Sequence, residues 1–119
     1  NAYHEARGEP EVGVLGVIAV TVNRMLHPKF PANGCDVVYQ KRSGICQFSW
    51  HCDDRIKPPQ QSHIERFKLL VKEYSYGLHE DPTNGSIFFH SIHVKPYWSR
   101  KSKPEVVLAN HAYFKELNK

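Results

Sequence analysis

The sequence predicts an α+β domain that is mostly helical and has a small antiparallel sheet toward its C-terminal end. Apolar residues recur at helical spacing from Val12 to Met25 and again from Ile64 to Tyr74. Short aromatic and β-branched runs, separated by turn residues, fill the last third of the chain. The 119 residues are enough for one core, so we expect a single domain spanning residues 1–119.

Composition and charge are those of an ordinary globular domain. Hydrophobic residues make up 40% of the chain and charged residues 24%. The apolar stretch at residues 12–22 is shorter than the roughly 20 residues of a membrane span, so it predicts a core helix and no span. The net charge of +4 suits an anionic partner. Because the cations are spread along the chain, at Lys41-Arg42 and Arg100-Lys101 for example, a solubilising surface explains them better, and we expect no nucleic-acid partner.

The chain opens with two helices separated by a break. Residues 1–7 have the character of the last turns of a helix, which Gly8 ends. Because there is no initiator Met and a helix is already under way, we expect that a segment upstream of Asn1 has been cut off or left out. Pro10 opens the second helix, which runs to about Leu26.

Gly13 and Gly16 lie inside this second helix, where each lowers the helix propensity by roughly 1 kcal/mol. The close approach of another backbone would explain such a cost, and we expect that backbone to be the segment around Glu5. After the helix, residues 35–40 predict either a short helix or a strand, because their periodicity does not separate the two. Residues 41–44 predict a loop.

A third helix and a small sheet follow. Ser62 and Glu65 form a capping box that predicts the start of the helix, and Gly77 predicts its end. Its apolar face is expected to consist of Ile64, Phe67, Leu70, Val71 and Tyr74. A turn is then expected at residues 81–85. Strands are expected at residues 86–90, 106–108 and 111–114.

Glu5 is the first candidate for chemistry, because it lies where two helices meet and one of them is buried. Burial raises the pKa of a carboxyl group by disfavouring its charged form, which can turn a glutamate into a proton donor. The alternative is a surface glutamate paired with Arg7. Glu9 suits the positive end of the following helix. Arg7 and Glu9 are therefore expected to support the Glu5 segment, and a direct catalytic role for Glu9 stays open.

Several motifs, in order along nearly the whole chain, resemble the SleB/CwlJ-type cell wall hydrolases. They begin with Glu5-Ala6-Arg7-Gly8-Glu9-Pro10 and Val22-Asn23-Arg24. They continue with Phe30-Pro31, Cys35, Val37-Val38-Tyr39-Gln40, Cys46-Gln47-Phe48-Ser49-Trp50 and Cys52-Asp53, then Asp81-Pro82-Thr83, Ser86-Ile87-Phe88-Phe89-His90, Lys95-Pro96, Trp98 and His111-Ala112-Tyr113-Phe114. The chain departs from the family pattern at Asn84-Gly85-Ser86 and Ala109-Asn110, which puts loop shape in doubt rather than activity.

The resemblance implies a lysozyme-like, lytic-transglycosylase-like fold that acts on peptidoglycan in the cell wall, whether the protein is bacterial or phage-encoded. It implies cleavage of the β-1,4 bond between N-acetylmuramic acid and N-acetylglucosamine, with Glu5 as the catalytic glutamate and no cofactor. A lytic transglycosylase, which forms a 1,6-anhydro product, needs no second carboxylate. Muramidase-type hydrolysis is the alternative, and nothing in the sequence places Asp36, Asp53 or Asp54 as its second acid. We expect a monomer.

Aromatic and amide side chains are expected to line the glycan cleft, because apolar walls with a few polar anchors are typical of small-ligand sites. The candidates are Gln47, Phe48, Ser49, Trp50, Tyr39 and His90. A place in the core is the alternative for Tyr39, His90 and at least one of Phe48 and Trp50.

Two other classes of function remain as alternatives. His90 and His93, with His51 and Cys52 or with His111, have the side chains of a zinc site, although their spacing matches no regular zinc motif, and we expect no metal. The second is a non-catalytic glycan-binding or virion module with the same fold. A disulfide between Cys46 and Cys52 is left open, since it depends on export.

Overall fold

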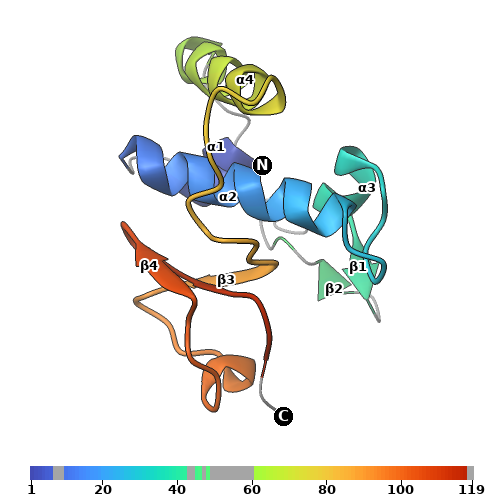
Figure 1. The fold of residues 1–119 in the computed structure, drawn as a ribbon, viewed down its shortest axis with the longest axis vertical. Coiled ribbons are helices and arrows are strands. Elements are labelled where there is room, and N and C mark those ends of the chain that lie inside the picture. The colour runs from blue at the N-terminus through green and yellow to red at the C-terminus, as the bar shows by residue number, and fades with distance from the viewer. Residues whose placement is uncertain (7–9, 43–44, 47, 49–60, 118–119) are drawn as a thin grey trace.

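The computed structural model describes residues 1–6, 10–42, 45–46, 48 and 61–117, and it confirms a mostly helical α+β fold. The helices are α1 (Ala2–Ala6), α2 (Glu11–Met25), α3 (Gly34–Val38) and α4 (Gln61–Ser75). The strands are β1 (Lys41–Arg42), β2 (Ile45–Cys46), β3 (Phe88–Ser91), β4 (Val106–Leu108) and β5 (His111–Phe114), and a 3-10 helix, η2, spans Tyr97–Ser99. Figure 1 shows α2 in the middle, with α4 on one side and the sheet on the other.

The expected core helix is α2. All residues from Gly13 to Val20 are buried, because α1 and α4 pack on one side of the helix and β4 contacts it from the sheet side. Pro10 was expected to open this helix but is its N-cap, and the helix begins one residue later at Glu11. Within the described ranges, no helix is long and apolar enough to cross a membrane.

Gly16 was expected to lie against the backbone around Glu5, and this expectation was wrong. A methyl group at Gly16 would overlap with the hydroxyl group of Tyr113, which reaches α2 from β5. The same hydroxyl group donates a hydrogen bond to the Gly13 carbonyl oxygen at 3.5 Å. The small residue therefore makes room for a fully buried aromatic ring, and the close contact joins the helix to the sheet.

The ends of α4 agree only partly with the sequence analysis. Gly77 has φ +77°, the Gly77 amide donates to the Tyr74 carbonyl, and the Leu78 amide donates to the Glu73 carbonyl, which together make a Schellman motif. The capping box was misplaced, because the helix begins at Gln61, before Ser62.

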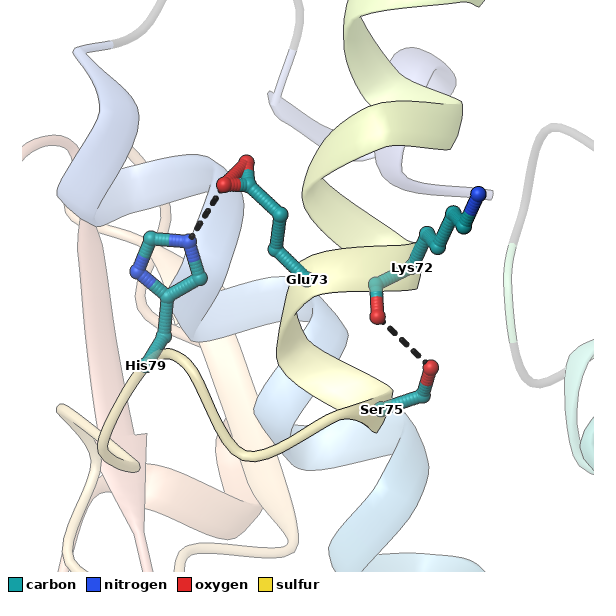
Figure 2. Close-up of polar contacts among 4 residues, drawn as sticks. All are labelled: Lys72, Glu73, Ser75 and His79. Atoms are coloured by element: carbon teal, nitrogen blue, oxygen red, sulfur yellow. Dashed lines mark hydrogen bonds and ion pairs between the residues drawn. The ribbon is translucent and has the colours of Figure 1, made fainter.

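One face of α4 packs inward through Phe67 and Leu70, which are buried. Val71 was expected on this face but is 47% exposed. The helix end is tied by two polar contacts that Figure 2 shows, an ion pair of 3.6 Å between His79 and Glu73 and a hydrogen bond of 2.7 Å from the Ser75 hydroxyl to the Lys72 carbonyl.

The segment at residues 34–46 contains a helix and a hairpin. Asn33 caps α3 by accepting hydrogen bonds from the Cys35 and Asp36 amides, which resolves the choice between helix and strand in favour of a helix. Lys41 and Arg42 were expected in a loop, but they form β1, which pairs antiparallel with β2.

The C-terminal sheet is antiparallel, as expected, and its strand order is β3-β5-β4. Strand β3 starts at Phe88 rather than Ser86, because the hydroxyl group of Ser86 donates to the Thr83 carbonyl and holds it in the preceding turn. Since side chains alternate along a strand, Phe88, His90 and Phe114 share one face, and Phe89 and Tyr113 share the other, which packs toward α2.

Candidate active site

Glu5 lies in the last turn of the short helix α1 and is half-buried. The surroundings are apolar, since Ala2 and Ala6 on the same helix belong to the core cluster with Val14, Val17 and Leu70. Desolvation by burial raises the pKa of the Glu5 carboxyl group, and the positive charge of Arg24 offsets only part of that rise. Glu5 is thus a carboxyl group held toward its protonated form.

Arg24 is the fixed cation near Glu5. It lies in the last turn of α2, is buried to 6% exposure, and donates from Nε to the Ile87 carbonyl oxygen at 2.7 Å. The guanidinium carbon lies 5.0 Å from the centre of the Phe30 ring and 5.2 Å from that of Phe48. These contacts hold the charge in one place, which makes its effect on the Glu5 carboxyl group constant.

A second carboxylate, Asp81, lies in the turn that precedes β3. Its Oδ2 accepts hydrogen bonds from Asn23 Nδ2 and the Gly85 amide, each at 2.9 Å. Its Oδ1 accepts from the Thr83 amide at 2.8 Å and from the Thr83 hydroxyl group at 2.6 Å. Burial acts to raise the pKa of Asp81, but these hydrogen bonds outweigh it and lower the pKa. The turn at residues 81–85 was expected; its bond to α2 through Asn23 was not.

The expected cleft residues are only partly described. Arg7, Glu9, Gln47, Ser49 and Trp50 lie outside the described residues. Phe48 is described, and at 3% exposure it packs in the core between Arg24 and Phe89, which was the alternative for this residue. In the structure, Phe48 therefore packs against the guanidinium group of Arg24.

Tyr39 is placed beside an apolar cavity of about 410 Å³ between α2, α3 and α4. The cavity is lined by Val17, Ile18, Val22, Met25, Val38 and Val71, among others. The first residues of the chain, Asn1 and Ala2, also line it, whereas Glu5 does not. Tyr39 is 51% exposed.

His90 lies on the sheet face that points away from α2. Its ring stacks on Phe114 with centroids 5.4 Å apart and meets Trp98 edge-on at 5.5 Å. Its Nδ1 lies 2.7 Å from the Ser91 carbonyl oxygen. His90 thus belongs to an aromatic cluster with Trp98, and a substrate contact by this residue stays a prediction.

The zinc alternative receives no support from the described ranges, in which no three His, Cys, Asp or Glu side chains come together. His111 is buried and meets the Phe89 ring edge-on. His51 and Cys52 lie outside the described residues, and so does the disulfide left open between Cys46 and Cys52. Cys35 is exposed and carries a free thiol.

A model of the family described as Cell Wall Hydrolase matches residues 8–114 of the chain. The chain belongs to this family. The resemblance noted in the sequence is therefore confirmed. The match begins three residues after Glu5, so it carries no information about that residue.

The relatives of this cell wall hydrolase agree with that assignment. A stretch of 38 residues is 50% identical to the spore cortex-lytic enzyme of Halalkalibacterium halodurans. It covers 32% of this chain and 12% of that protein, so the match spans a small part of the relative's length.

Two solved structures are similar over 96% of the chain. One is the catalytic domain of the Bacillus cereus SleB protein, with a TM-score of 0.72, 24% identity and 83% of that chain covered. The other is the catalytic domain of the germination-specific lytic transglycosylase SleB from Bacillus anthracis, with a TM-score of 0.74, 25% identity and 87% covered. The hydrolase therefore has the fold of SleB catalytic domains.

Proposed function

We propose that this cell wall hydrolase cuts the glycan strands of peptidoglycan between N-acetylmuramic acid and N-acetylglucosamine, with Glu5 as its general acid. The observation that carries the proposal is the raised pKa of a half-buried glutamate at the end of α1. Glycosidic cleavage needs a proton for the leaving oxygen as the anomeric carbon becomes cationic, and a raised pKa favours the protonated form of the carboxyl group that would supply it.

The reaction that fits one glutamate is lytic transglycosylation. Glu5 donates its proton to the bridging oxygen while the bond from that oxygen to C1 of the muramic acid breaks. The C6 hydroxyl oxygen of the same sugar then bonds to C1, and the Glu5 carboxylate takes the hydroxyl proton. The products are a 1,6-anhydro-muramyl end and a free 4-hydroxyl on the neighbouring sugar. Glu5 regains its proton and no water is consumed.

Arg24 supports this cycle by its charge. After the first step the Glu5 carboxyl group is negative, and burial alone would make that state costly. The fixed guanidinium group of Arg24 lowers the cost, since its effect on the pKa of Glu5 is opposite to that of burial. A donor whose pKa is raised only in part can both hold and release a proton.

The remaining parts of the proposal concern the substrate contacts and the place of action. We propose that Gln47, Ser49, Trp50 and Tyr39 line the glycan groove, that Arg7 and Glu9 support Glu5, and that the enzyme acts as a monomer on the wall outside the cytoplasmic membrane. Tyr39 is supported by its exposed ring at the rim of the apolar cavity, where a sugar ring can stack.

The test is mass spectrometry of the muropeptides released from purified sacculi. Wild type is compared with Glu5→Gln and with Glu11→Gln, a matched control at an exposed glutamate in the first turn of α2. We expect anhydro-muramyl ends from wild type and from the control, and none from Glu5→Gln. Reducing muramyl ends would instead establish muramidase-type hydrolysis. Equal release by Glu5→Gln would reject Glu5 as the acid.

A further inference from the structure

The connection between β3 and β4 forms a separate lobe at the end of the molecule farthest from α4 (Figure 1). Its two ends are hydrogen-bonded to the sheet, from the Ile92 amide to the Asn110 carbonyl at 2.9 Å and from the Glu105 amide to the Tyr113 carbonyl at 2.7 Å. Its inner anchor is Trp98, whose ring lies 6.1 Å from Phe88 and 5.4 Å from Phe114.

This lobe holds the excess positive charge of the protein. Residues 92–104 of this connection include Lys95, Arg100, Lys101 and Lys103 and no Asp or Glu, which gives them a charge of +4. Glu105, the last residue before β4, lowers the charge of the whole connection to +3. The whole chain has 16 Lys and Arg against 12 Asp and Glu, so the residues outside 92–104 have 12 of each and sum to zero. All four cations of the lobe are exposed. The excess was expected to be spread along the chain.

Exposed apolar side chains accompany these cations. Ile92 is 48% exposed, Val94 56% and Tyr97 83%. The guanidinium carbon of Arg100 lies 5.6 Å from the centre of the Tyr97 ring, so a cation and a flat aromatic face are presented together. A surface of this kind offers charge to an anionic group and a stacking face to a sugar ring.

We propose that residues 92–104, the cationic lobe, bind the anionic polymers of the cell wall and hold the enzyme on its substrate. The ligand chemistry is a polymer with closely spaced carboxylate or phosphodiester groups, which peptide stems or wall-attached polymers can supply. A membrane surface fits less well, because interfacial binding uses a continuous apolar helix face, and this lobe has only the single turn of η2. The proposal rests on the wall as the substrate and is independent of Glu5 as the acid.

The test is co-sedimentation of the protein with purified sacculi, measured in the cold and at short times so that binding is scored before turnover. The lobe variant is Lys95→Gln, Arg100→Gln and Lys103→Gln together. The matched control is Arg66→Gln, Lys68→Gln and Lys72→Gln on α4, which also removes one exposed Arg, near the Phe67 ring, and two exposed Lys. Thermal melting verifies that both variants are folded.

We expect the lobe variant to bind about tenfold more weakly near 50 mM salt, with a shallower loss of binding toward about 200 mM, because fewer counterions are displaced. The control should stay within about twofold of the parent, because isolated surface charges contribute little. Sacculi treated to remove phosphodiester polymers separate the two sources: lost binding identifies the phosphodiesters, and retained binding identifies the peptide carboxylates. Equal weakening in both variants, no weakening in the lobe variant, or binding only to anionic lipid vesicles would overturn the proposal.

Discussion

The carboxyl groups of Glu5 and Asp81 have pKa values that are shifted in opposite directions. Glu5, at the end of α1, is half-buried beside apolar residues, and its pKa is raised by burial. Asp81, in the turn before β3, is also half-buried, but its oxygens accept hydrogen bonds from Asn23, Thr83 and Gly85, and its pKa is lowered. Burial acts in the same direction on both groups, so the hydrogen-bond donors decide the difference.

This difference separates the carboxyl group that we propose as the general acid from one whose hydrogen bonds stabilise the fold. A charged Asp81 ties the turn to α2, because each of its partners is a donor. The raised pKa of Glu5 favours the protonated form, which is the form that the proposed general acid uses. The two sites are joined by consecutive residues of α2, because Asn23 binds Asp81 while the charge of Arg24 acts on Glu5.

The largest expected effect is on catalysis by Glu5. Glu5→Gln should lower muropeptide release by about 10²–10⁴-fold, the usual contribution of a general acid. Its stability at neutral pH should be equal to or higher than that of wild type, because no charge has to be buried. The wild-type stability that comes from a raised pKa is complete at low pH and is lost as the pH rises through that pKa. Denaturant unfolding at several pH values checks this, and lower stability of Glu5→Gln at neutral pH would contradict it.

The next largest effect concerns the packing of α2 on the sheet. Asn23 and Arg24 of this helix act on Asp81 and Glu5. Gly16→Ala should lower the free energy of unfolding by about 1–3 kcal/mol, because the new methyl group overlaps with the rigid, buried ring of Tyr113. Gly34→Ala is the matched control, since its nearest neighbour is the flexible Met25 side chain at 3.4 Å. Urea unfolding measures both, and equal losses would show that Tyr113 does not set the spacing.

Asp81→Asn should have a smaller effect of about 2 kcal/mol on stability, because its new amide group would face donors where the carboxylate accepted hydrogen bonds. The contribution of a group with a lowered pKa is complete above its ordinary pKa and is lost as the pH falls through the lowered value. The difference from wild type should therefore shrink in acid. A loss that does not change with pH would mean that Asp81 acts by shape alone.

The smallest effect is a gain in stability that leaves both sites unchanged. Ala109, between β4 and β5, has φ +52°, a conformation that costs a residue with a Cβ atom roughly 1–2 kcal/mol. Ala109→Gly should raise the free energy of unfolding by up to about 1 kcal/mol. The gain is smaller than the strain relieved, because glycine gives the unfolded chain more conformational entropy. Ala112→Gly in β5 is the control and should be destabilising. A destabilised Ala109→Gly would show that the turn is not strained.

The sequence predicted the elements of the fold because their signals are local. Pro10 and Gly77 marked helix ends, and the aromatic runs near His90 and Tyr113 marked strands. The contacts around Glu5 and Asp81 join residues that are far apart in the sequence. The spacing of apolar residues within one element does not predict such contacts. Gly16 signalled a close neighbour, but nothing in the sequence showed that it was Tyr113. Asn23 stood out in the sequence only as part of a family motif, and its partner Asp81 lies 58 residues away.

The raised pKa of Glu5 is the basis of the proposed chemistry, and a site-resolved NMR titration of the side-chain carboxyl groups measures it directly. Glu5 should titrate above the ordinary range of a glutamate, while Asp81, in the same sample, should titrate below the ordinary range of an aspartate. A Glu5 carboxyl group that titrates at or below the value of an exposed glutamate such as Glu11 would contradict the account.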